Sequence, residues 1–147
     1  VGRRTKEKGY DVLMKAFLLS QDYELITVYG RPWQEAIRLI ASSELLVVPS
    51  LMEGLPTVIL EAFASGTAVI ASKIGGITEL IEDGVNGLLF EAGNHVELSK
   101  LIKQLLQDEG LRKSITDKAK EKVKRQYDWK HATEGYLRIY GECLGKN

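Results

Sequence analysis

Three segments combine charged side chains with glycines, and together they indicate a site for an anionic ligand. The first, residues 2–9, carries two arginines and two lysines directly before a predicted helix. Basic side chains clustered near free backbone N–H groups suit a phosphate or a diphosphate. Taken alone, this segment is explained equally well as a solvated basic loop.

The second segment, residues 49–57, leads from an apolar run into a predicted helix. Gly54 lets a ligand approach the backbone, and the N–H groups at the helix start favour an anion. Glu53 and Glu61 are eight positions apart, which at helical rise separates their carboxylates by roughly 10–12 Å. That distance is too large for an acid/base couple on one bond but suits two ends of an extended ligand. A helix-borne glutamate such as Glu61 is otherwise an ordinary solvated residue.

The third segment, residues 72–79, again passes from an apolar run through a glycine pair, Gly75 and Gly76, into a helical pattern. A glycine pair after a strand is a weak signal by itself. Its value comes from its expected position next to the second segment, because ligands of parallel α/β sheets bind at the carboxyl ends of the strands.

Apolar runs alternate with helical patterns along the chain, which predicts an α/β fold with a doubly wound parallel sheet. The predicted strands are 24–29, 45–49, 68–71 and 87–90. The predicted helices are 10–20, 33–42, 56–65, 77–82, a helix that Asn94 caps with Glu97 three residues later, 109–126 and 129–144. We expect one domain over residues 1–147, with 109–147 forming its closing helices.

The composition excludes several classes of protein. Twenty basic and twenty acidic residues give the 147-residue chain no net charge, which argues against a nucleic-acid binder. The single cysteine, Cys143, leaves no internal disulfide and favours a cytoplasmic location. His95 and His131 lack partners at ligand spacing, so no metal site is expected. The glycine-rich phosphate loops of nucleotide-binding motifs are absent, as is any run long enough to span a bilayer.

Charge is nevertheless uneven along the chain. Residues 112–130 contain eight basic side chains and three acidic ones. A solvated helix face explains this pattern best. The alternative is attraction of a membrane-peripheral protein to anionic lipid.

Five stretches carry a resemblance to a known family: EGLPTVILEA (53–62), SGTAVIA (65–71), GGITE (75–79), EDGVNGLLF (82–90) and YDW (127–129). They resemble the C-terminal, donor-binding domain of the retaining glycosyltransferases of group 1 (GT4), which have the GT-B fold. The opening residues Gly2-Arg3 and Lys8-Gly9 are similar to that family's first donor loop. The resemblance covers nearly the whole chain.

The resemblance implies a role for each matching residue. Arg3 and Lys8 would contact the diphosphate, and Glu53 and Glu61 would be the two glutamates of an E-x7-E motif. In that motif Glu53 lies against the donor sugar and its reaction centre, whereas Glu61 accepts hydrogen bonds from the ribose. The backbone turn around sugar and phosphate would comprise Gly54, Leu55, Pro56 and Thr57, with Gly75 and Gly76 in a neighbouring loop.

The family further implies transfer of a hexosyl group, with retention, from a UDP-, GDP- or ADP-sugar to a hydroxyl acceptor. No metal or other cofactor is expected, and the acceptor would bind to an N-terminal domain that precedes Val1. The alternatives are a non-catalytic nucleotide-sugar binding module and a related enzyme such as a sugar-nucleotide epimerase. One departure is expected to matter: between Ser20 and Trp33 roughly 20–30 residues of the family pattern are absent.

Overall fold

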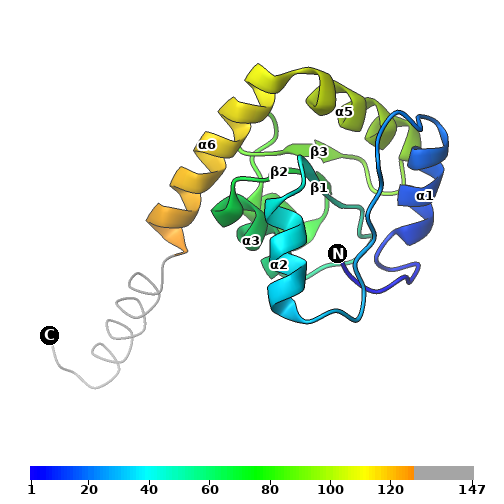
Figure 1. Ribbon diagram of the computed structural model, residues 1–147, viewed down its shortest axis with the longest axis horizontal. Helices are drawn as coiled ribbons and strands as arrows, with labels where there is room; N and C mark the ends of the chain where they lie inside the picture. The colour runs from blue at the N-terminus through cyan, green and yellow to red at the C-terminus, as the bar shows by residue number, and fades with distance from the viewer. Residues whose placement is uncertain (128–147) are drawn as a thin grey trace, which may run out of the picture.

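The structure, a computed structural model, describes residues 1–127 and contains a three-stranded parallel sheet (Figure 1). The strands are β1 (Leu45–Val48), β2 (Ala68–Ser72) and β3 (Leu88–Phe90), in the order β1-β2-β3. Leu45 lies opposite Ala68, and Ile70 lies opposite Leu88. All five residues of β2 are buried, as expected for the central strand of a sheet covered on both faces.

Six helices accompany these strands in the described part of the chain. They are α1 (Tyr10–Leu18), α2 (Trp33–Ala41), α3 (Thr57–Ser65), α4 (Gly75–Leu80), α5 (His95–Gln107) and α6 (Glu109–Gln126). Helices α1 and α5 cover one face of the sheet, α2 and α3 cover the other, and α6 leads away from the end of α5 (Figure 1). No helix within residues 1–127 is both long and apolar enough to cross a membrane.

The two faces of the sheet carry separate hydrophobic cores because side chains alternate along each strand. Val69 and Ala71 of β2 pack with α3, and Phe63 of that helix is fully buried. Ala68 and Ile70 point to the opposite face, where they pack with α1 and α5. This arrangement confirms the doubly wound parallel sheet.

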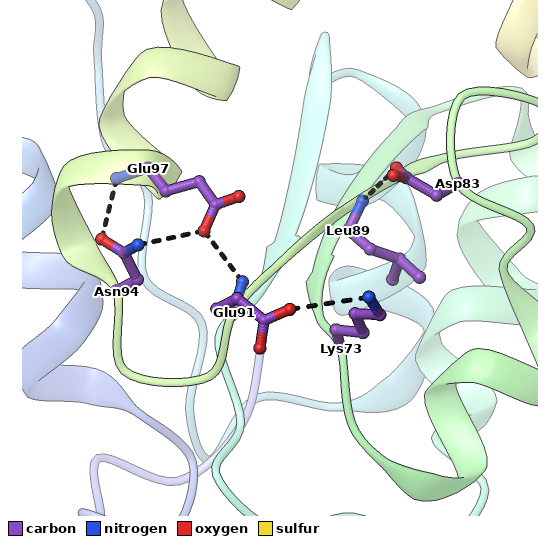
Figure 2. Close-up of polar contacts among 6 residues, drawn as sticks. All are labelled: Lys73, Asp83, Leu89, Glu91, Asn94 and Glu97. Atoms are coloured by element: carbon purple, nitrogen blue, oxygen red, sulfur yellow. Dashed lines mark hydrogen bonds and ion pairs between the residues drawn. The ribbon is translucent and has the colours of Figure 1, made fainter.

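The connection from β3 into α5 is fixed by side chains that bond to the backbone (Figure 2). Asn94 caps α5 by accepting the N–H of Glu97 at 3.1 Å, and the Glu97 carboxylate accepts the N–H of Glu91 at 3.0 Å. The cap predicted at Asn94 is therefore confirmed. Lys73, which follows β2, pairs with Glu91 at 3.6 Å across the ends of the two strands.

Residues 24–29 do not form the predicted strand. A cavity of about 460 Å³ separates this segment from β1; its lining includes Leu25 to Val28 on one side and Leu45 to Val47 on the other. Paired strands lie about 4.8 Å apart, so a cavity of this size is incompatible with a ladder. Among residues 1–127, the one backbone hydrogen bond to this segment runs from the N–H of Gly2 to the carbonyl of Val28, at 2.9 Å.

Several predicted boundaries also shift. Helix α4 begins at Gly75, two residues before the predicted start, so Gly75 and Gly76 form its first turn and not a loop. Pro56 is the N-cap residue before α3 and not its first helical residue, whereas α3 ends at Ser65 as predicted and is followed by Gly66, which has a positive φ. Helix 109–126 is confirmed. The helix predicted for 129–144 lies outside the described residues.

Candidate functional site

The three segments that carry the charged residues and glycines converge at the carboxyl ends of β1 and β2. The N–H of Leu51 donates to the carbonyl of Glu7 at 2.8 Å, which joins the first segment to the second. A Cβ at Gly9 would overlap the carbonyl oxygen of Pro49, and one at Gly76 would overlap that of Gly54. Glycine is therefore needed at both positions, because the backbones lie too close for any side chain.

Lys8 and Glu53 form an ion pair at the centre of this arrangement. The Lys8 Nζ lies 2.5 Å from Glu53 Oε1, and the buried Ser50 donates its hydroxyl to the same oxygen at 3.3 Å. The side chains of Lys8 and Glu53 are 30% and 15% exposed, so the pair is partly shielded from solvent but a ligand can reach it. An ammonium group that is held beside a carboxylate can also bind an anionic ligand. The ligand then takes the place of the carboxylate next to the ammonium group.

Glu61 lies in the second turn of α3 and contacts α2. The indole Nε1–H of Trp33, the first residue of α2, donates to Glu61 Oε1 at 3.0 Å. Neither this contact nor the Lys8–Glu53 pair could be read from the sequence, since the partners are 28 and 45 positions apart. Trp33 is a functional candidate that the sequence analysis did not single out.

The start of α3 presents backbone donors to solvent between these side chains. Within residues 1–127 the N–H groups of Gly54, Leu55, Thr57 and Val58 have no hydrogen-bond acceptor. Gly54, Leu55 and Thr57 are exposed, while Pro56 is buried and anchors the turn. No atom lies within 4 Å of a Cβ position at Gly54, so a ligand can approach the backbone there, where the helix dipole favours negative charge.

Arg3 is not brought into the Lys8–Glu53 pair. In the described chain no hydrogen bond or ion pair joins it to Glu53 or Glu61; it lines a surface hollow with Arg4, Thr5, Thr27, Tyr29 and Arg31. Arg3 and Lys8 do border the same cavity beneath residues 22–28. The two members of the predicted basic pair thus lie along one wall of the domain, with only Lys8 in contact with a predicted glutamate.

Tyr23 borders that cavity as well. Burial, and to a lesser extent the neighbouring Asp22 carboxylate, raise the pKa of its phenol above the usual value. Its ring packs edge-on against Phe17, with 5.5 Å between ring centroids. Its hydroxyl is buried and has no partner among the described residues. Tyr23 therefore stays neutral at physiological pH.

The described part of the chain has no cluster of three or more His, Cys, Asp or Glu residues that could hold a metal ion. Lys73 is the one basic residue in segments 49–57 and 72–79, and it forms an ion pair with Glu91 at the surface. It forms no hydrogen bond or ion pair with Glu53 or Glu61 within residues 1–127.

Comparison with known proteins shows which family the chain is similar to. Residues 18–122 match the sequence model of the family described as glycosyl transferases group 1. An uncharacterized glycosyltransferase of Methanocaldococcus jannaschii is 30% identical over 165 aligned positions, which cover 97% of this chain and 47% of the relative. The chain therefore spans about half the length of that relative.

Two solved structures share the fold. The Anabaena protein Alr3699/HepE, solved in complex with UDP-glucose, superposes with a TM-score of 0.79 at 23% identity, covering 96% of this chain and 47% of that one. The C-terminal domain of a group 1 glycosyl transferase from Francisella tularensis superposes with a TM-score of 0.77 at 24% identity, covering 88% of this chain and 84% of that domain. These likenesses confirm the fold class, a Rossmann-like half of a GT-B structure.

The alignment with the Methanocaldococcus relative also shows that the two chains differ in length within the matched region. It runs over 165 positions although it uses only 97% of 147 residues. The relative therefore has additional residues inside the aligned stretch.

Proposed function

The chain belongs to the glycosyl transferases group 1 family, and from that premise we propose that it binds the nucleotide-sugar donor of a retaining, metal-independent transferase. The observation that supports this most directly is the placement of Glu53 and Glu61 on either side of the α3 N-terminus, with Lys8 beside the first. This spacing suits a ligand with a sugar at one end, a diphosphate in the middle and a ribose at the other.

The diphosphate is assigned to Lys8 and the start of α3. The Lys8 ammonium exchanges part of its contact with Glu53 for a phosphate oxygen, and the free N–H groups of Thr57 and Val58 donate to the same group. These donors stabilise the charge that develops on the departing nucleoside diphosphate, a role that a divalent ion takes in other transferases. Arg3 reaches the diphosphate from the neighbouring hollow.

Glu53 is assigned to the donor sugar. In the proposed reaction the bond from the anomeric carbon to the diphosphate breaks while an acceptor hydroxyl bonds to that carbon on the same face. The acceptor proton passes to the departing phosphate oxygen, and the hexosyl group keeps its configuration. Glu53, fixed by Lys8 and Ser50, positions the sugar and stabilises its positive charge.

Glu61 is assigned to the ribose hydroxyls, because a carboxylate at the far side of the α3 start accepts two hydrogen bonds from a vicinal diol. Gly75 and Gly76 support this surface through the close approach of Gly76 to Gly54. A binding module without transfer activity is a second candidate.

Calorimetry of the 147-residue chain with UDP-, GDP- and ADP-glucose tests the proposal. We expect at least one of them to bind with a dissociation constant below about 1 mM. Glu61→Gln should weaken that binding while leaving the thermal unfolding midpoint in place, and EDTA should change neither. Absence of binding by all three sugars would remove donor binding as the function, and a requirement for a divalent ion would contradict the metal-free assignment.

An assay with the donor and hydroxyl acceptors separates the two candidates. Release of free nucleoside diphosphate from the donor on addition of hydroxyl acceptors indicates transfer. Binding of the donor without any turnover indicates a binding module.

A further inference from the structure

Trp33 is unusual because a large aromatic side chain lies mostly in solvent while its one polar atom is bonded. Trp33 is 62% exposed, yet its indole Nε1 lies 3.0 Å from Glu61 Oε1 and donates a hydrogen bond to it. We propose that Trp33 is a positioning residue that holds Glu61 ready for the donor's ribose. This inference rests on the donor-binding function proposed above.

The backbone on both sides of this contact is fixed by the core. Ile40 of α2 and Ile59 of α3 are buried in the same hydrophobic cluster, so the two helices cannot slide past each other without disrupting it. Trp33 opens α2 directly after Pro32, whose restricted φ limits how the chain enters the helix. The indole N–H is thereby presented to Glu61 by elements that are already rigid.

The bond to Trp33 matters because a glutamate side chain has three rotatable bonds. An unrestrained Glu61 would lose rotamer freedom on binding a ligand, at a cost of the order of 1–2 kcal/mol. With Oε1 held by the indole, that entropy is lost during folding and not during binding. The oxygen Oε2 makes no hydrogen bond within residues 1–127, so it remains to accept from the ribose proposed to lie at the start of α3.

A structural and a positioning role make different predictions for ligand binding. If Trp33 only joins α2 to α3, its replacement lowers the free energy of unfolding and leaves affinities unchanged. If it positions Glu61, its replacement weakens a ligand that carries ribose and spares one that lacks it. Inorganic pyrophosphate is such a ligand, because it keeps the diphosphate contacts and has no ribose.

The experiment is calorimetry of the 147-residue chain with UDP and with inorganic pyrophosphate. GDP and ADP serve in place of UDP if they bind the wild-type chain more tightly. Trp33→Phe, which removes the N–H and keeps an aromatic ring, should raise the nucleotide dissociation constant about five- to thirtyfold, which corresponds to the roughly 1–2 kcal/mol of rotamer freedom that an unrestrained Glu61 loses on binding. The pyrophosphate constant should change by less than about twofold.

A double-mutant cycle with Glu61→Ala, which removes the acceptor of the indole N–H, completes the test. In the Glu61→Ala background, Trp33→Phe should have almost no further effect on nucleotide affinity. Tyr127→Phe is the control, because Tyr127 is also an exposed aromatic residue that loses one donor and lies at the end of α6; its nucleotide affinity should equal that of the wild type.

Two results would overturn the inference without touching the proposed function: unchanged nucleotide affinity in Trp33→Phe, and additive effects of the two substitutions. A wild-type chain that binds none of the three nucleotides would contradict the proposed function itself. A ligand-free check is the ¹⁵N–¹H spectrum, in which the Trp33 indole signal should shift in Glu61→Ala and stay in place in Tyr127→Phe.

Discussion

At the scale of single residues, the contact between Lys8 and Glu53 determines what the site can do before any ligand arrives. The carboxylate is held by an ammonium and by the Ser50 hydroxyl at one oxygen, Oε1. Its second oxygen makes no hydrogen bond among the described residues. The site is therefore preorganised around Glu53, while the charge of Lys8 is available to a ligand anion that competes for it.

Replacement of Lys8 tests that competition. Lys8→Met keeps the aliphatic stem and removes the ammonium, so we expect the dissociation constant for UDP to rise about tenfold, the loss typical of one charge-assisted hydrogen bond. Isothermal titration calorimetry measures the change. Lys6→Met is the control because Lys6 belongs to the same segment and is exposed. Equal losses in both variants would mean that only the general charge of the segment matters.

At the scale of elements, the close approach of three segments depends on two glycines. A Cβ at Gly76 or at Gly9 would overlap a carbonyl oxygen of the second segment. We expect Gly76→Ala and Gly9→Ala each to lower the free energy of unfolding by about 2–4 kcal/mol, because the backbones must separate. Urea unfolding followed by circular dichroism measures this effect.

Gly54→Ala is the matched control for these two variants, since no atom lies within 4 Å of its Cβ position. Its unfolding free energy should stay within about 0.5 kcal/mol of the wild-type value, as for an ordinary surface substitution. A loss at Gly54 equal to that at Gly76 would show that the cost arises from the backbone and not from the predicted overlap.

The segment 22–29 should be the least protected part of the domain. None of its N–H groups donates a backbone hydrogen bond within the described chain, and a cavity lies between it and β1. In hydrogen-exchange mass spectrometry we expect peptides from 22–29 to exchange within seconds, whereas peptides covering β2 stay protected for hours. Protection of 24–29 equal to that of β2 would mean that this segment forms the strand predicted from its sequence.

The sequence predicted the elements that have strong local signals. The apolar runs at β1, β2 and β3, the Asn94 cap and the Gly66 terminus are all local patterns, and the structure confirms them. The strand at 24–29 was wrong although its β-branched residues are typical of strands, because a strand also needs a neighbour to pair with. In this structure a cavity, and not a paired strand, lies between residues 24–29 and β1.

In the candidate site, too, some features could be predicted from the sequence and others depend on long-range contacts. The convergence of three segments followed from the rule that parallel strands present their carboxyl ends together. The contacts of Glu53 with Lys8 and of Glu61 with Trp33 depend on packing between distant elements. The start of α4 at Gly75 depends on the approach of Gly76 to Gly54, a long-range contact that no local pattern reports.

At the scale of the whole molecule, the sheet keeps its core although no strand pairs with the second edge of β1 within residues 1–127. A cavity of about 460 Å³ lies there, lined by residues of β1 and of the segment 25–28. The two hydrophobic cores are nevertheless built on all three strands and on the helices that cover them, so β2 stays buried on both faces.

The distribution of basic side chains on α6 bears on membrane binding, and part of this charge is used within the domain. On α6, Arg112 donates to the carbonyls of Leu105 and Leu106, and Lys122 donates to those of Glu79 and Leu80. Arg125 pairs with Glu121 at 2.8 Å. These basic groups are engaged at the ends of helices α5 and α4 or within α6 itself.

Four exposed lysines, Lys113, Lys118, Lys120 and Lys124, make no ion pair or hydrogen bond within residues 1–127. A basic residue near an anionic bilayer contributes ~1 kcal/mol, so the four supply about 4 kcal/mol, an association constant near 10³ M⁻¹. We therefore expect most of the chain to stay in the supernatant when vesicles containing about one-third phosphatidylserine are sedimented at physiological salt and about 0.1 mM accessible lipid. Co-sedimentation that Lys113→Gln, Lys118→Gln, Lys120→Gln and Lys124→Gln together abolish would instead assign α6 to a membrane surface.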